Sequence, residues 1–488
     1  MIALRQRLRG YWAESLVAAL LAAVATLAIA VFAERRLGGV GLFVPLILVG
    51  VVVLLRRPLV AVAIAVVAPI VCEGSTFGIP VMTHLYDRVY KQLTALDVLV
   101  VLAGVAVGAD LVRRRRQPHL PGALALPLLL VALAMAAGFA VTRAGGANFR
   151  DTLFAMHVLF YLLVIPPAIV NLDLDRDRLA LLLKGAIALA VLKAIMGLIV
   201  LAGGGSVELN GGTHLTYYEP TANWLIMMAL LGTIAALVGG LARERWMALA
   251  VPLLTASLVL SYRRSFWIAA VLGLLLVLLL GTSPRGRRAL IPVVVLVAAA
   301  IWVLGSVGFQ AQTPLANRVQ SLSPTNLESN AEDRYRLDER ANVIAEIKHH
   351  PIAGIGLERG WVASVRSLPV EHVDGRLYVH FALLWWWLKL GILGAAAFAA
   401  LLIGGFVLAW RTWRRSREPI FRSFGLASLV GFAGLIAIET TASFSGVDAR
   451  FTVALGAQLG LLAALSAGSP ARAAPDQLAD RSALTSAV

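Results

Sequence analysis

Two adjacent arginines in the second half of the chain are candidates to bind phosphate. Arg263 and Arg264 stand between two apolar stretches that almost no loop separates. Ionisable residues beside apolar spans are costly and usually face a cavity or a partner, and the planar guanidinium group suits bidentate phosphate binding. In the alternative interpretation the pair belongs to a simple turn, from which basic side chains extend to lipid headgroups.

A polar segment farther along the chain predicts an amphipathic helix over residues 332–350. Ser329 and Glu332 have the spacing of a helix capping box, and Pro351 ends the pattern. At 100° per residue one narrow face carries Arg336, Arg340, Val343 and Ile347. Such a helix suits a membrane surface near lipid phosphates. In the alternative it is an ordinary solvated helix whose acids pair the arginines: Glu332, Asp333, Asp338 and Glu339.

A histidine stands where the chain becomes apolar again. The helix is followed by a tight glycine-bearing turn, Pro351-Ile352-Ala353-Gly354-Ile355-Gly356, and Tyr378-Val379-His380 then leads into a long apolar span. His380 can act as a general base or donate a hydrogen bond to phosphate. A lone histidine at such a boundary also serves as a structural polar anchor.

The composition indicates an integral membrane protein. Of the 488 residues 59% are hydrophobic and 14% are charged, and the mean hydropathy is +0.83. An average soluble domain has about a quarter of its residues charged. The single cysteine, Cys72, excludes an internal disulfide and a cysteine-rich metal site. We attribute the net charge of +16 to basic loops rather than to binding of nucleic acid.

Apolar runs of bilayer-spanning length predict an all-α bundle of about 12–14 transmembrane helices. The spans are 15–33, 39–55, 58–72, 95–112, 121–141, 153–170, 179–202, 222–240, 246–262, 265–281, 289–309, 379–409, 424–442 and 449–467. The first of them resembles a signal peptide in its end, Val31-Phe32-Ala33, but its length favours a retained helix.

The distribution of basic residues predicts the orientation. With the amino terminus in the cytoplasm most arginines of the short loops face inward, as the positive-inside rule requires, and both termini are cytoplasmic. The predicted parts are N-terminal transmembrane helices (1–245), helices flanking the arginine pair (246–309), an extracytoplasmic loop (310–378), C-terminal transmembrane helices (379–467) and a disordered cytoplasmic tail (468–488). The arginine pair, the amphipathic helix and His380 then share the outer side.

The order of these motifs resembles the superfamily of O-antigen ligases and O-antigen polymerases. The resemblance covers about residues 250–405 and rests on Arg263-Arg264-Ser265, on the turn ending in Gly354-Ile355-Gly356, on Tyr378-Val379-His380 and on Leu390-Gly391-Ile392-Leu393-Gly394. Farther upstream, Tyr218-Glu219-Pro220-Thr221-Ala222-Asn223 resembles the family's entry to a span.

The family's functional residues can be carried over to matching positions. Arg264 takes the place of the arginine in the family's Ser-Arg step, and Arg263 stands where the serine is usual. Arg336 or Arg340 matches the arginine upstream of the turn, and His380 matches the histidine of a His-Asn motif. Two positions depart from the pattern: Phe381 replaces the asparagine, and Lys389 occupies a position where an acid is common.

The resemblance implies a membrane glycosyltransferase that needs no metal or other cofactor. Such an enzyme moves a glycan from a polyprenyl-pyrophosphate carrier to an acceptor hydroxyl of a glycan or glycolipid, at the outer face of the cytoplasmic membrane. Catalysis would rest on His380, Arg264 and Arg336, and substrate binding on Arg263, Arg340, Glu219 and His214. A transporter or flippase of a lipid-linked substrate is the alternative, and a non-catalytic partner in polysaccharide export is a third class.

Other charged residues permit further hypotheses. Asp173-Leu174-Asp175 has the spacing of a metal-binding motif, but acids at that point also favour the positive end of a helix dipole. Lys193, Lys389 and Glu439 fall inside predicted spans, where charges are usually functional. Lys389 and Glu439 are candidates to pair with each other. Glu208, together with His214 and Glu219, is a candidate to line the path of the acceptor.

Overall fold

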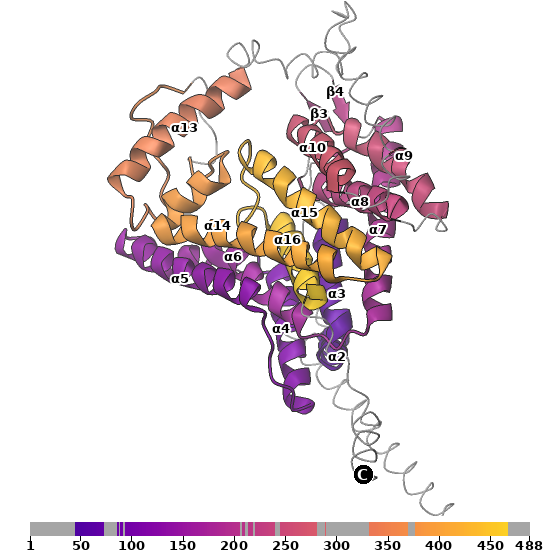
Figure 1. The fold of residues 1–488 in the computed structure, drawn as a ribbon. Helices are drawn as coiled ribbons and strands as arrows, with labels where there is room; N and C mark the ends of the chain where they lie inside the picture. Colours follow the sequence, from indigo (N-terminus) through magenta and orange to yellow (C-terminus); the bar gives the residue numbers. More distant parts are fainter. Residues whose placement is uncertain are drawn as a thin grey trace, which may run out of the picture.

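The computed structural model describes residues 44–72, 85–86, 88–90, 93–204, 207–209, 213–217, 220–239, 245–280, 288, 331–368 and 376–466. Within these ranges the chain is almost entirely helical (Figure 1). Its helices are α2 (Val44–Arg56), α3 (Pro58–Val71), α4 (Ala95–Arg113), α5 (Gly122–Ala144), α6 (Phe149–Val170), α7 (Arg176–Ala202), α8 (Pro220–Val238), α9 (Arg245–Val259), α10 (Arg264–Leu280), α13 (Ala331–His349), α14 (Ala382–Arg415), α15 (Pro419–Glu439) and α16 (Ala449–Ser466).

Two short antiparallel hairpins interrupt the helices. Strand β1 (Arg88–Tyr90) pairs with β2 (Leu93–Thr94), and β3 (Val207–Leu209) pairs with β4 (Thr213–Leu215). The predicted all-α membrane bundle is confirmed. In the described ranges eight helices are long and apolar enough to cross a membrane, or nine if α2 and α3, bent by 113°, form one broken span. The predicted spans 15–33 and 289–309 and the predicted tail 468–488 lie outside the described residues.

Local capping explains where several helices begin. Thr94 and Asp97 form a reciprocal capping box at α4, in which the Asp97 N–H donates to Thr94 Oγ1 over 3.1 Å and the Thr94 N–H donates to the Asp97 carboxylate over 2.7 Å. Asp175 caps α7 by accepting a hydrogen bond from the Arg178 N–H, and Asp173 is paired with Arg114 at 2.7 Å. The acids of the Asp173-Leu174-Asp175 motif therefore serve as a helix cap and an ion-pair partner.

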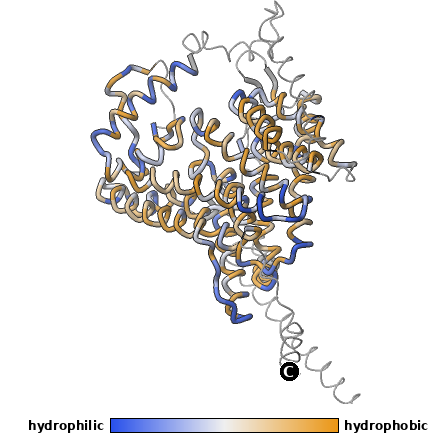
Figure 2. The backbone as a smooth tube through the Cα atoms, in the orientation of Figure 1, coloured by the Kyte–Doolittle hydropathy of each residue, from blue (hydrophilic) through white to orange (hydrophobic). Residues whose placement is uncertain are grey.

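Most of the helices pack around one large apolar core, and two smaller apolar clusters lie among the described helices. α14 lies along α5 and α15, α16 packs on α6, and α15 also contacts α8 and α10. Figure 2 shows apolar residues along these helices and hydrophilic residues on α13 and at several connections. α13 is the predicted amphipathic helix, and its buried Val343 and Ile347 join the same core.

A break in α14 fixes how α13 is attached to the bundle. Gly391 interrupts α14 with φ 67° and ψ −163°, and the turn that follows α13 fills the break. The Ile355 N–H donates to the Leu388 carbonyl over 2.7 Å, and the Ile392 N–H donates to the Ile352 carbonyl over 3.1 Å. A Cβ on Gly354 would lie 2.6 Å from the Gly391 nitrogen, so the two backbones meet with no room for a side chain.

The same turn is tied to the end of α5. The Leu357 N–H donates to Thr142 Oγ1 over 2.9 Å, and a Cβ on Gly356 would approach that oxygen to the same distance. Gly354 and Gly356 both have positive φ, which glycine adopts without strain. The two glycine motifs of the sequence therefore contact each other and hold α13 at one end of the bundle.

We expect Gly391→Ala to lower the stability of the protein by about 2–4 kcal/mol, because the new Cβ meets backbone atoms at a residue with positive φ. The measurement is the thermal unfolding midpoint of the purified protein in detergent. Gly108→Ala in α4 is the matched control, since a Cβ there has open space around it. Equal midpoints for the Gly391 variant and the wild type would contradict the packing described here.

Candidate functional site

The arginine pair lies in a strained turn between α9 and α10. Tyr262 has φ 52°, an uncommon conformation for a residue with a side chain. Ser261 Oγ and Trp267 Nε1 both donate to the Leu258 carbonyl, over 2.7 and 3.0 Å, which holds the turn closed. Because α10 begins at Arg264, its positive dipole end adds to the charge of the guanidinium groups.

Arg264 and Arg336 meet at one carboxylate. The Arg264 guanidinium binds Asp333 in a bidentate manner, with three N···O distances of 2.9–3.0 Å. Arg336 Nη1 lies 3.6 Å from Asp333 Oδ1. The Arg264 and Asp333 side chains are only 11% and 12% exposed, and that of Arg336 is 23% exposed. Two arginines predicted from separate motifs are thus brought together by α13.

His380 is held by a buried carboxylate of α13, that of Glu339. Its backbone N–H donates to Glu339 Oε2 over 2.9 Å, and its Nδ1 lies 3.0 Å from that oxygen. The Glu339 side chain is 3% exposed. A carboxylate in this position accepts the Nδ1–H and so makes Nε2 the basic nitrogen of the neutral ring. The rings of Tyr378 and Tyr335 pack edge-on against the imidazole at 4.9 and 5.8 Å.

α13 therefore connects Arg264 and Arg336, which form a cationic cluster around Asp333, to His380. Asp333 and Arg336 lie on its first turns, and Glu339 follows on the next turn. From Asp333 to Glu339 the helix axis rises by about 9 Å. The separation between the two groups is fixed by one continuous helix rather than by a loop.

The segment from Thr440 to Asp448 supports the histidine from the other side. The Ser443 N–H donates to the Tyr378 hydroxyl over 2.9 Å, and Ser443 Oγ donates to the Val379 carbonyl. Burial, together with the negative charges of Glu439 and Glu339, raises the pKa of Tyr378, and Arg263 acts in the opposite direction. The Tyr378 phenol is therefore a neutral group at physiological pH, with Arg263 close enough to influence it.

The two charges predicted to pair inside α14 and α15 have other partners. Glu439 accepts hydrogen bonds from the N–H groups of Phe444 and Ser445 and from Ser445 Oγ, over 2.6–3.1 Å. Lys389 Nζ donates to the Arg359 carbonyl. Glu439 thus organises the chain that supports Tyr378, and Lys389 fastens the segment that leads from α13 toward His380.

The remaining predicted residues have different positions. Arg340 is exposed, and its guanidinium carbon lies 5.3 Å from the centre of the Phe381 ring. Of the two alternatives on α13, Arg336 is the one next to Arg264. His214 is in β4, and the Thr216 N–H just beyond it donates to the Leu260 carbonyl, which brings this hairpin beside the arginine turn. Glu219 lies outside the described residues.

The sequence did not single out Asp333, Glu339, Tyr335 or Tyr378 as members of a site. The sequence pattern places the two acids only in the solvated alternative for the helix, and that alternative is partly right because Asp333 does pair with Arg336. Across the described ranges no three His, Cys, Asp or Glu side chains are grouped so as to hold a metal ion.

Fold and site together define a polytopic helical membrane protein with a cationic cluster and a carboxylate-held histidine at one end of the bundle. Residues 248–399 match the family model described as O-antigen ligase, and this match confirms the family resemblance. The matched segment includes Arg264, α13, His380 and the break at Gly391. No curated protein matches the chain.

The ion pair at the centre of this site can be tested without any assay of activity. We expect Asp333→Ala to destabilise the protein by about 2–3 kcal/mol, because it leaves two largely buried guanidinium groups without their carboxylate. Combining Asp333→Ala with Arg264→Ala should cost less than the sum of the single changes, with a coupling of about 1–3 kcal/mol.

The measurement is a double-mutant cycle on thermal unfolding in detergent. Arg334→Ala serves as the control, since this side chain is 71% exposed and its ion pair with Asp338 is long, at 4.0 Å. Additive single changes would show that Arg264 and Asp333 do not interact.

Proposed function

We propose that the protein transfers a glycan from a polyprenyl-pyrophosphate carrier to an acceptor hydroxyl at the outer face of the cytoplasmic membrane, as an O-antigen ligase or polysaccharide polymerase would. The observation that carries the proposal is the convergence of Arg264 and Arg336 on one anion, with His380 held by Glu339 on the same helix. The family match over this segment supports a glycan-transferring enzyme.

In this proposal the carrier pyrophosphate replaces the Asp333 carboxylate between the two arginines. A pyrophosphate is a good leaving group once its charge is neutralised, and preorganised guanidinium groups provide that neutralisation. The α10 N-terminus adds to the same positive field. Arg263, which is close enough to act on Tyr378, would contact the second phosphate.

His380 would act as the general base. The acceptor hydroxyl attacks the anomeric carbon, and the bond from that carbon to the pyrophosphate oxygen breaks. The hydroxyl proton passes to Nε2, and the polyprenyl pyrophosphate leaves with the bonding electrons. Glu339 fixes the tautomer and stabilises the imidazolium that results. A contact between His380 and the pyrophosphate remains the alternative role.

The charges at the opposite end of the bundle support the proposed side of the membrane. Arg114 at the end of α4 pairs with Asp173 just before α7, and Arg176 at the start of α7 pairs with Glu418, next to the end of α14. The turn that follows α13 is attached near the opposite end of α14, at residues 388 and 392. By the positive-inside rule the end with these arginines is cytoplasmic, and the site faces outward. The exposed Arg340 and the hairpin that bears His214 would then contact the acceptor or lipid headgroups, and Glu219 remains a substrate-binding proposal.

A transporter or flippase of a lipid-linked substrate is the second candidate. The feature that favours it is the glycine break in α14, since discontinuous helices form the sites of many transporters. The backbone of residues 352–356 fills this break and bonds to it on both sides. The enzyme is therefore the better supported function.

Purified protein supplied with a polyprenyl-pyrophosphate glycan and an acceptor should form the transferred product. We expect Arg264→Ala and His380→Ala each to lower the transfer rate by at least about 100-fold, because they remove charge stabilisation and the general base. Arg334→Ala, on an exposed neighbouring position, should retain the wild-type rate. The enzyme proposal fails if no product forms and both site variants support wild-type glycan assembly in cells.

The displacement of Asp333 gives a separate expectation for donor binding. Asp333→Asn removes a competing negative charge while it keeps the size of the side chain, so the KM for the donor should fall severalfold. Arg336→Gln should raise that KM, and Arg340→Gln should change it little because Arg340 does not contact Asp333. Initial rates at varied donor concentration measure all three, and a higher KM for Asp333→Asn would refute the displacement.

A further inference from the structure

A basic cleft lies at the end of the bundle opposite α13. It has a volume of about 340 Å³ and is bounded by the first turn of α7, the connection from α14 to α15 and the last turn of α16. Its polar lining includes Arg176, Arg415, Arg417 and Glu418. No part of the site described above lies in this cleft.

The cleft has an excess of positive charge. Arg176 lies 3.6 Å from Glu418, the one acid among the lining residues. In the part of the chain that the structure describes, neither Arg415 nor Arg417 forms an ion pair. α15 begins beside these residues, and the Glu418 side chain makes no capping hydrogen bond there. The uncapped positive end of α15 therefore adds to the two arginines.

The other half of the cleft is apolar. Leu179, Phe421 and Leu465 line the cleft, and a second cavity of about 160 Å³ lies against the same three helices. Leu183 and Leu461 line that cavity, one helical turn from Leu179 and Leu465 of the cleft. Because residues four apart lie on the same face of a helix, the cleft and the cavity face the same sides of α7 and α16.

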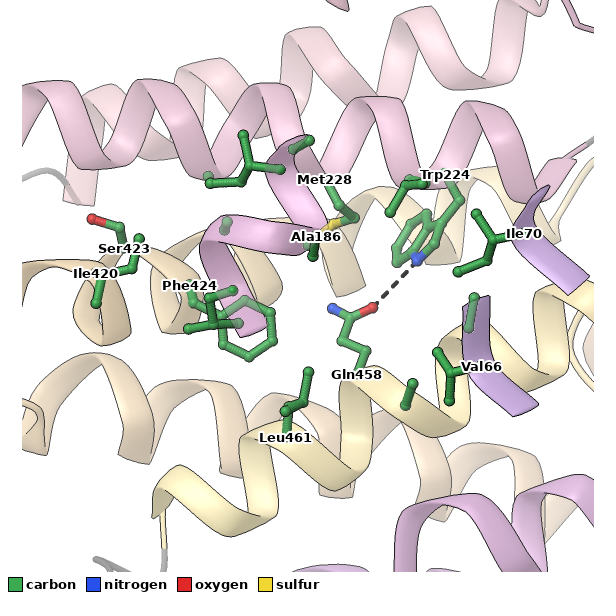
Figure 3. Close-up of a pocket in the computed structure, with 18 residues that line it drawn as sticks. Val66, Ile70, Ala186, Trp224, Met228, Ile420, Ser423, Phe424, Gln458 and Leu461 are labelled. Carbon is green, nitrogen blue, oxygen red and sulfur yellow. Dashed lines mark hydrogen bonds between the residues drawn. The ribbon is translucent and has the colours of Figure 1, made fainter. Parts of the chain in front are cut away.

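The second cavity is almost wholly apolar. Figure 3 shows Ile420, Phe424 and Leu461 around one part of it, and the hydrogen-bonded pair of Trp224 and Gln458 at another. Trp224 Nε1 lies 3.2 Å from Gln458 Oε1. On α7 the exposed Ala186 also lines the cavity, so this wall reaches the lipid-facing surface of the bundle.

We propose that the cleft and the cavity together bind one anionic phospholipid of the adjoining leaflet. The phosphate would lie among Arg176, Arg415 and Arg417, and one acyl chain would enter the apolar cavity. A basic pocket between transmembrane helices suits a lipid headgroup. A soluble phosphate compound would leave the apolar half of the cleft without a partner. This proposal does not depend on the proposed transferase activity.

Native mass spectrometry of the full chain in a neutral detergent tests the proposal. The probes are phosphatidylglycerol and phosphatidylcholine with identical acyl chains, and glycerol 1-phosphate as a headgroup without chains. We expect phosphatidylglycerol to bind at least about fivefold tighter than phosphatidylcholine, since one arginine near a headgroup contributes about a fivefold effect. Glycerol 1-phosphate at millimolar concentration should not compete.

Two kinds of variant separate the headgroup from the chain. Arg417→Gln should lower the affinity for phosphatidylglycerol about fivefold and leave the affinity for phosphatidylcholine unchanged. Ala186→Phe, which places a large ring at an exposed wall of the cavity, should lower the affinity for both lipids. Arg411→Gln is the matched control, because this exposed arginine of α14 is outside the lining of the cleft. Unchanged thermal unfolding of the variants without added lipid would show that they fold.

Three results would overturn the proposal. Equal binding of the two lipids would exclude recognition of charge. An equal loss of affinity for phosphatidylglycerol in Arg411→Gln and Arg417→Gln would show that general surface charge, and not this cleft, causes the preference. Competition by glycerol 1-phosphate as strong as that of the lipid would indicate a soluble phosphate ligand in place of a phospholipid.

Discussion

The contact on which the rest of the structure depends is the backbone packing between the turn at residues 352–356 and the break in α14 at Gly391. Two hydrogen bonds join the two segments, and no side chain fits between them. This contact anchors one end of α13, and the pair of Arg264 and Asp333 anchors the other. A polar helix with little apolar surface is thereby held rigidly against a membrane bundle, and its carboxylates and Arg336 have fixed positions.

The site balances charges that would be costly alone. Two arginines share Asp333, and the imidazole of His380 is bonded to Glu339, so each largely buried ionic group has an opposite charge or a hydrogen-bond partner beside it. Tyr335 and Tyr378 enclose the imidazole and limit the directions from which another molecule can reach it. Such an arrangement needs no bound substrate to balance its charges, and the proposed replacement of the carboxylate by an anion would require little reorganisation.

Much of the fold could be predicted from the sequence, because apolar runs of bilayer length and the spacing of α13 are strong local patterns. The separate prediction of Arg264, Arg336 and His380 also followed from residue type and order. The partners of these residues could not be predicted, since Asp333 and Glu339 have no feature in the sequence that distinguishes them from the solvated acids of a helix. Their roles depend on which helix face meets α10 and α14. The backbone break at Gly391 likewise required the three-dimensional contact, because a glycine within an apolar run is common.

The tethered carboxylate of Asp333 sets a threshold for anions at the arginine site. Because it is attached to α13, it competes at a high effective concentration that does not depend on dilution. Phospholipids that surround the protein present a single negative charge on their phosphodiester, whereas a lipid diphosphate presents more charge and more acceptor oxygens. In the proposed reaction, an arginine site guarded in this way would stay closed to the abundant lipids of the bilayer and would open to a scarce diphosphate.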